Sequence, residues 1–152
     1  MAPQTLDAEF EGIELFPVQL TVGMRVGHPK RHCRSLRDLH SQEWLFPGDS
    51  SRDRDAMAGL FSPLGLTPPA RMIFGESVTV ALGLVGQTEL VGMFVEPLVE
   101  LAFKRYGIRR AEVKERLPVL SMCVIQRRGQ RLAPAAQQFV DCIRHAAALR
   151  PA

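Results

Sequence analysis

The sequence predicts one α/β domain built on a parallel or mixed sheet. Apolar runs of strand length alternate with segments of helical periodicity, which is the rhythm of strand–helix–strand units. The chain has 152 residues, of which 46% are hydrophobic and 23% charged, which is enough to bury one core. Its eleven prolines and twelve glycines favour many short elements over a long helical bundle.

The central stretch, residues 76–97, carries the clearest pattern. Four apolar side chains recur at helical spacing and predict the buried face of a helix: Val78, Ala81, Leu82 and Val85. Gly86 is placed to end this helix. Residues 90–95 are nearly all apolar, as expected of a strand covered on both faces. Pro97 then begins a further helix, at a position where a missing N–H has no cost.

The residues before this stretch predict shorter elements. Residues 13–26 alternate as strands do, and Pro17 is expected to divide them into two strands. Ser35 is placed to cap a short helix. Residues 44–46 and 71–74 are short apolar runs that predict buried strands.

The residues after this stretch predict the close of the fold. Residues 110–115 alternate, and residues 119–126 form a strongly apolar strand. Pro134 begins the last helix, whose regular apolar face is Ala136, Phe139, Val140, Ile143 and Ala147.

The charge pattern gives little support to nucleic-acid binding. The formal net charge is +3, from 19 Lys or Arg against 16 Asp or Glu, and the basic residues are scattered. The densest basic cluster is interrupted by Asp38 and contains no aromatic residue; it consists of Lys30, Arg31, Arg34 and Arg37. We interpret it as a solvated face.

Cysteine and histidine usage predicts neither a disulfide framework nor a metal site. Cys33, Cys123 and Cys142 are odd in number and have no CxxC spacing, so we expect reduced and mostly buried thiols. Four potential ligands lie close in the sequence, without regular geometry or a completing carboxylate: His28, His32, Cys33 and His40. We interpret these histidines as surface residues of a connector and predict no metal and no cofactor.

The N-terminus has no basic start followed by an apolar run, and no apolar stretch reaches the length of a membrane span. The sequence therefore predicts a cytoplasmic protein.

The sequence Gly75-Glu76-Ser77-Val78-Thr79 allows two chemical interpretations. A serine between a strand and a helix resembles the nucleophile elbow of serine hydrolases, but Thr79 stands where that motif has glycine. His145 is the one histidine downstream, and Asp141 is its helical neighbour rather than an independent acid. The alternative is that Ser77 and Thr79 bind a small polar ligand at a helix start. We prefer binding and predict no catalytic residue.

A second polar segment, Asp49, Ser50 and Ser51, lies between a predicted strand and a predicted helix. Its hydroxyls and free backbone N–H groups suit a bound carboxylate or another anion, whereas plain N-capping explains the same residues. Both interpretations stay open.

Three stretches in this order and at these distances resemble the effector-binding domain of LysR-type transcriptional regulators. They are HPKRHCRSLRDLHSQEWLFPG, ESVTVALGLVGQTELVGMFVEP and LPVLSMCVIQRRGQRLAPAAQQFVDCIRHA, and the resemblance covers roughly residues 12–148. Glu96 departs from the family pattern by standing before Pro97, and Ala133 departs from it by replacing a serine cap.

The resemblance implies a periplasmic-binding-protein-like fold of type 2 with two α/β subdomains. Residues 28–118 would form a nearly complete second subdomain, and residues 12–27 and 119–150 a truncated first one. The winged helix-turn-helix that binds DNA in this family would precede residue 1, so this chain is not expected to bind an operator by itself.

The resemblance also implies a ligand-sensing function. The effector would be a small organic acid, aromatic compound or sugar, held in a cleft between the subdomains, and the chain would form a homo-oligomer. The cleft positions fall on Asp49, Ser50, Ser51, Glu76, Ser77, Thr79, Phe94 and Val95. Glu76 disfavours an anionic effector unless Arg71 or Arg52 offsets its charge. A solute-binding module without a DNA partner and a small serine hydrolase are the alternatives.

Overall fold

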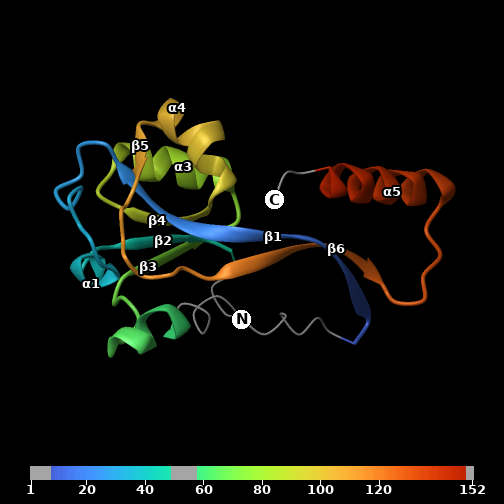
Figure 1. Ribbon diagram of the computed structural model, residues 1–152, viewed down its shortest axis with the longest axis horizontal. Coiled ribbons are helices and arrows are strands. Elements are labelled where there is room, and N and C mark those ends of the chain that lie inside the picture. The colour runs from blue at the N-terminus through green and yellow to red at the C-terminus, as the bar shows by residue number, and fades with distance from the viewer. Residues whose placement is uncertain (1–7, 49–57, 150–152) are drawn as a thin grey trace. The chain divides into compact units, whose positions relative to one another are not determined.

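A computed structural model describes residues 8–48 and 58–149. The chain divides into two compact units, Gln19–Pro118 and Met1–Val18 with Val119–Ala152. Figure 1 shows the elements, which in chain order are β1 (Phe10–Arg25), α1 (Leu36–Leu39), β2 (Trp44–Pro47), η1 (Ser62–Leu64), β3 (Met72–Gly75), α3 (Val78–Gln87), β4 (Val91–Val95), η2 (Val99–Phe103), α4 (Lys104–Tyr106), β5 (Ile108–Arg110), β6 (Val119–Arg127) and α5 (Pro134–Ala148).

The larger unit, Gln19–Pro118, is built on a mixed sheet of strand order β3-β2-β4-β1-β5. Strand β2 runs parallel to both β3 and β4, whereas β1 runs antiparallel to β4 and β5. The registers Trp44↔Met72 and Trp44↔Val91 set the three parallel strands level with one another. The predicted α/β class and the mixed sheet are confirmed.

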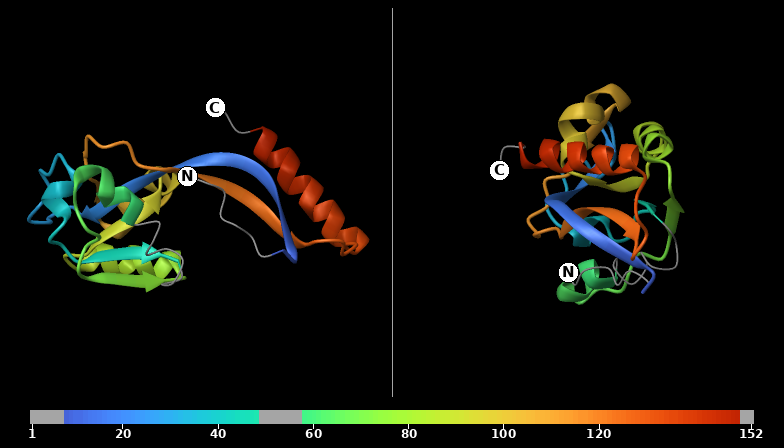
Figure 2. Two further views of the ribbon diagram at one scale, coloured as in Figure 1. Left: turned by 90° about the horizontal axis from the view of Figure 1, so that it is seen from below. Right: turned by 90° about the vertical axis from the view of Figure 1, so that its right-hand side faces the viewer.

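Helices cover both faces of this sheet (Figures 1 and 2). On one face Leu45 packs with α3 and its neighbours in a buried cluster that also contains Ala81, Leu82, Val85, Leu90, Phe94, Phe103 and Ile108. On the other face the Trp44 ring stacks on Phe46 at 5.6 Å and meets Phe61 edge to face at 5.6 Å. Successive side chains of β2 thus point to opposite layers, as the pleat of a strand requires.

The prediction that Pro17 divides the first strand is wrong, because β1 runs unbroken from Phe10 to Arg25. Strands β4 and β5 pair only with its second half, from Leu20 onward. Among the described residues, the first half pairs with β6 alone. A strand with one free edge tolerates proline there, because a missing N–H then removes no ladder bond.

The prediction that Gly86 ends the central helix is also wrong. Helix α3 continues to Gln87, and Thr88 caps it with N–H and hydroxyl bonds to the Leu84 carbonyl of 3.0 and 2.8 Å. Gly86 serves close packing instead: a Cβ there would lie 2.0 Å from the Tyr106 carbonyl oxygen. Glycine is needed because α3 and the end of α4 touch through their backbones.

Two elements after β4 differ from expectation. Residues from Pro97 onward are helical as predicted, but Val99–Phe103 form a π-helical turn. The strand predicted over residues 110–115 is shorter and earlier, at Ile108–Arg110. The Ala111 N–H still bonds to the Val22 carbonyl of β1 at 2.8 Å, but the Lys114 N–H bonds to the Arg34 carbonyl at 3.0 Å, so the chain has left β1 by that residue.

The smaller unit contains the first half of β1, β6 and α5. The Gln126 Nε2 donates to Glu11 at 2.7 Å and the Arg128 N–H to the Glu9 carbonyl at 2.7 Å. Helix α5 begins at Pro134 as predicted, but of its expected apolar face only Val140 is buried, and Phe139 is 66% exposed. The expectation of mostly buried thiols holds for Cys33 and is wrong for Cys123 and Cys142, and all three are free.

Helix α1 confirms the predicted cap and adds a long-range partner. Ser35 is the N-cap, and Asp38 completes a capping box. Glu115, from a distant segment, accepts a bond from the Ser35 hydroxyl at 2.5 Å and one from the Leu36 N–H at 3.1 Å. Burial alone would raise the pKa of Glu115, but these two bonds, a backbone hydrogen bond at Glu115 itself and the nearby Lys114 charge together lower the pKa below its ordinary value.

We expect Glu115 to contribute to acid sensitivity. Because its pKa is lowered by folding, its stabilisation is present above about pH 4.5 and is lost as pH falls through the folded-state pKa. Glu115→Gln should therefore reduce the loss of unfolding free energy between neutral and acidic pH by about 0.5 to 1 kcal/mol, a modest effect because water screens a partly exposed carboxylate. Urea unfolding at both pH values measures it. Glu112→Gln, at an exposed position, is the control, and equal changes in the two variants would contradict the assignment.

Candidate functional site

The carboxyl ends of the three parallel strands meet at one edge of the sheet. The register Pro47↔Gly75 brings β2 and β3 to an end together, and the Gly48 N–H bonds to the Gly75 carbonyl at 3.0 Å. Strand β4, on the other side of β2, ends at Val95. The loops after all three strands therefore open onto the same edge, where open α/β sheets bind ligands.

The elements that follow β2 and β3 in the described chain lie on opposite layers of the sheet. After β2 the chain continues to the layer of Phe61, which contacts Trp44, and after β3 it enters α3 on the layer of Leu45. In open α/β sheets, ligands bind between two strand ends whose following elements lie on opposite layers. A Cβ built on Gly75 would meet no atom within 4 Å, so this point of the edge is open. Gly75 was not predicted as a site residue, although a glycine directly after a predicted strand was an available signal.

Ser77 stands at the start of α3 at this edge. It is the N-cap of the helix, with φ −92° and ψ 108°, and its hydroxyl accepts a bond from the Val80 N–H at 3.4 Å. The N–H groups of Val78 and Thr79, the first two residues of the helix, have no acceptor within the helix. The helix dipole adds positive potential at the same point. Glu76, Ser77 and Thr79 are all exposed. This helix start can thus offer donors and a hydroxyl to a polar ligand.

Two predicted positions on β4 have different surroundings. Val95 is half-buried at the strand end, whereas the Phe94 side chain is 1% exposed and packs edge to face on Phe103 at 5.4 Å. The Phe94 ring is therefore part of the core and has no surface to offer a ligand. Glu96 follows them, and its carboxylate pairs with Arg110. The second carboxylate oxygen of Glu96 is buried without a hydrogen-bond partner among the described residues.

Asp49, Ser50, Ser51 and Arg52 lie outside the described residues. Arg71 precedes β3 and lies at the amino end of that strand, opposite the edge where Glu76 follows it. Arg71 therefore cannot offset the charge of Glu76, as had been considered.

A hollow of about 360 Å³ lies at this amino edge. Its lining comes from the residues just before the three parallel strands, among them Glu43, Arg71 and Thr88. We place the candidate site at the carboxyl edge nevertheless, because the start of α3 lies there and open α/β sheets bind ligands at the carboxyl ends of their strands.

The geometry does not form a nucleophile elbow. That motif requires a sharp, strained turn that lifts the serine above the sheet. Ser77 instead has ordinary extended backbone angles, and its hydroxyl is engaged in capping. Within residues 8–48 and 58–149, all positive φ values belong to glycines.

The histidine interpretation needs one correction, because His28 is not a surface residue. It is 0% exposed; its Nδ1 accepts from the Lys30 N–H at 3.0 Å and its Nε2 lies 3.0 Å from the Glu89 carbonyl oxygen. His28 thereby links the end of β1 to the start of β4. In the part of the chain that the structure describes, no three His, Cys, Asp or Glu side chains gather as a metal site.

The mixed α/β sheet with helices on both faces is that of a class, the periplasmic-binding-protein-like domains of type 2. Within that class the chain belongs to the LysR substrate binding domain family, whose sequence model matches residues 1–148. Members of this family are regulatory ligand-binding domains of transcription regulators and not, in general, enzymes. No helix of the described residues is long and apolar enough to cross a membrane.

Known proteins agree with this assignment. The HTH-type transcriptional regulator GalR of Pseudomonas putida is 26% identical over 151 residues, which are 95% of this chain and 36% of GalR. The chain thus spans about a third of that relative. The effector binding domain of QuiR in complex with shikimate has a TM-score of 0.72 at 19% identity, covering 95% of this chain and 68% of the other. The Synechocystis CcmR regulatory domain in complex with 2-PG has a TM-score of 0.73 at 15% identity, covering 100% and 73%.

Proposed function

We propose that this chain is the ligand-sensing part of a LysR-type DNA-binding transcriptional regulator and that it works in the cytoplasm. A small organic effector binds at the carboxyl edge of β2, β3 and β4. The observation that supports this most is that the described elements after β2 and β3 lie on opposite layers of the sheet, with the exposed start of α3 next to Gly75. The domain carries out no catalysis, and the DNA contact belongs to a winged helix-turn-helix.

The proposed contacts are the Ser77 hydroxyl, the first N–H groups of α3 and the half-buried Val95, with Thr79 and Glu76 at the rim. The helix N-terminus favours an acidic or phosphorylated group, whereas the exposed Glu76 carboxylate favours hydroxyl groups on the ligand. A hydroxylated organic acid, an aromatic acid or a sugar fits these surroundings. Asp49, Ser50 and Ser51 remain proposed contacts. The division into a second subdomain, residues 28–118, and a first subdomain, residues 12–27 with 119–150, also remains a proposal.

Effector binding would shift a conformational equilibrium of the domain, and this shift would change the arrangement of subunits in an oligomer. An apolar surface in the larger unit supports a homo-oligomer: Val80 and Leu84 lie one turn apart on α3 and are 58% and 40% exposed, and Ile73 on the edge strand β3 is 39% exposed. Sedimentation over a concentration series tests this association, and a monomer at every concentration would contradict it.

The variant Ser77→Asp tests the site. Aspartate caps a helix as well as serine does, so the stability of α3 should stay within about 0.5 kcal/mol. Its charge, however, should repel an acidic effector and remove the hydroxyl donor, so we expect binding to weaken at least about tenfold. Calorimetry with a panel of shikimate, other hydroxy and aromatic acids, phosphorylated acids and sugars measures the affinity.

Ser62→Asp is the matched control, because it adds the same charge at an exposed serine of η1. It should leave binding unchanged. The site assignment fails if no compound of the panel binds, or if Ser62→Asp weakens binding as much as Ser77→Asp does.

A further inference from the structure

Two segments far apart in the sequence bring their positive charge together in the larger unit. Residues 30–38 and 109–116 are joined by the bond from the Lys114 N–H to the Arg34 carbonyl and by the bonds of Glu115 to the start of α1. The two segments hold eight Lys or Arg against three Asp or Glu, a net charge of +5, whereas the rest of the chain holds eleven against thirteen, a net charge of −2. The fold therefore concentrates a charge that looked scattered along the sequence.

The net charge of +5 already includes the three acidic residues of these segments, of which Glu112 is exposed and the other two are held at α1. The Asp38 carboxylate accepts from the Arg34 and Ser35 N–H groups at 3.1 and 3.2 Å, and Glu115 is bound to Ser35 and Leu36. Both carboxylates are thus used by the backbone of α1 and its cap.

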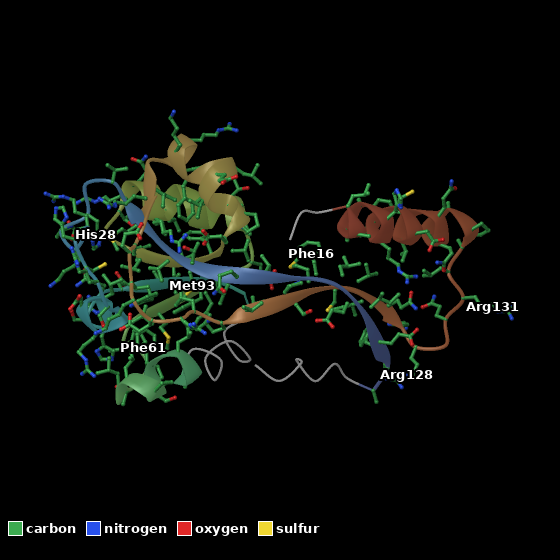
Figure 3. The ribbon with its side chains drawn as sticks, viewed as in Figure 1. Phe16, His28, Phe61, Met93, Arg128 and Arg131 are labelled. Carbon is green, nitrogen blue, oxygen red and sulfur yellow. The ribbon has the colours of Figure 1, made fainter. Side chains whose placement is uncertain are left out.

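Apart from Arg110, the basic side chains of these segments make no ion pair with a described residue, although the Arg37 guanidinium donates to the Leu64 carbonyl oxygen. The ion pairs recorded among residues 8–48 and 58–149 are those of Arg25 with Glu89 and of Arg110 with Glu96. The following seven side chains form no ion pair with a described residue: Lys30, Arg31, Arg34, Arg37, Arg109, Lys114 and Arg116. All are exposed except the half-buried Arg109. We call these seven the basic face; in Figure 3 nitrogen-tipped side chains surround the α1 end of the unit near His28.

We propose that the basic face binds the phosphate backbone of duplex nucleic acid without reading its sequence. The two segments contain no aromatic residue on which single-stranded bases could stack. They also contain none of the exposed large apolar side chains of the described residues, so nothing there would enter a lipid surface. Clustered Lys and Arg without either feature match a helix of evenly spaced phosphates.

This contact goes beyond effector sensing and does not depend on it. In a DNA-binding regulator, a sensing domain that touches phosphates beside the operator would add salt-sensitive affinity and leave base recognition to the DNA-binding domain.

Fluorescence anisotropy of the 152-residue chain with a labelled DNA duplex of arbitrary sequence, titrated at several salt concentrations, measures the contact. The patch variant Lys30→Gln, Arg31→Gln and Lys114→Gln keeps every backbone bond described above. Neutralising three phosphate contacts should weaken binding at least tenfold at about 50 mM salt and reduce the slope of log K against log salt by roughly 2 to 3.

A control variant with the same loss of charge, Arg127→Gln, Arg131→Gln and Arg144→Gln in the smaller unit, should change the affinity less than threefold. Circular dichroism confirms that both variants fold. The proposal is overturned if the chain does not bind the duplex at low salt, if the two triple variants lose affinity equally, or if phosphatidylserine vesicles bind through the basic face and DNA does not. Calorimetry with the effector panel tests the proposed effector site separately from DNA binding, because no residue of the basic face lies at the carboxyl edge.

Discussion

Gly86→Ala is expected to lower the free energy of unfolding by about 3 kcal/mol. An added Cβ would lie 2.0 Å from the Tyr106 carbonyl oxygen, which is a backbone atom and cannot turn aside as a side chain can. Helix α3 would have to move away from the end of α4, and the buried cluster that contains Val85 and Ile108 would lose contact. The gain in helix propensity, about 1 kcal/mol, does not offset this.

Gly83→Ala in the same helix is the control for Gly86→Ala. A Cβ on Gly83 meets no atom within 4 Å, so alanine should stabilise the chain by roughly 0.5 to 1 kcal/mol through helix propensity alone. Urea unfolding followed by the fluorescence of Trp44, the one tryptophan, reports on the larger unit because that ring is buried there. Effects of equal sign in the two variants would show that close packing does not explain Gly86.

Local signals predicted much of the fold. Ser35 caps α1 through its own side chain, Pro134 opens α5, and the apolar runs at β2 and β4 form buried strands. Each of these depends on neighbours within a few residues, which the sequence displays directly. The alternation of strands and helices also predicted which loops follow the parallel strands, and this is why Ser77 was placed correctly at a helix start.

The errors have long-range causes. Pro17 is tolerated because of which strands pair with β1, and Gly86 is needed because of Tyr106, twenty residues further along the chain. The Phe94 ring was expected at the ligand edge, but strand alternation alone does not reveal that Phe103 covers it. The basic face is another case, since the engagement of Asp38 and the approach of residues 109–116 depend on tertiary structure.

His28→Leu is expected to cost about 3 kcal/mol of unfolding free energy. Leucine has a similar volume, so the variant removes two hydrogen bonds without leaving a large cavity. The Lys30 N–H would lose its acceptor and the Glu89 carbonyl its donor, and an unsatisfied buried group costs about 1 to 3 kcal/mol. Because Nδ1 accepts from the Lys30 N–H, the proton of the neutral ring belongs on Nε2, where it is donated to Glu89.

The loss should be concentrated in the connection between β1 and β4. Hydrogen exchange should therefore become faster at Lys30 and at Leu90, whose N–H lies beside the start of β4, before it changes in the centre of the sheet. His32→Leu is the control, since His32 is exposed in the same connector, and it should stay within about 0.5 kcal/mol of the unchanged chain. If the two histidine variants unfold alike, the buried ring is not what fixes this connector, and its backbone hydrogen bonds, such as that from the Lys114 N–H to the Arg34 carbonyl, hold it instead.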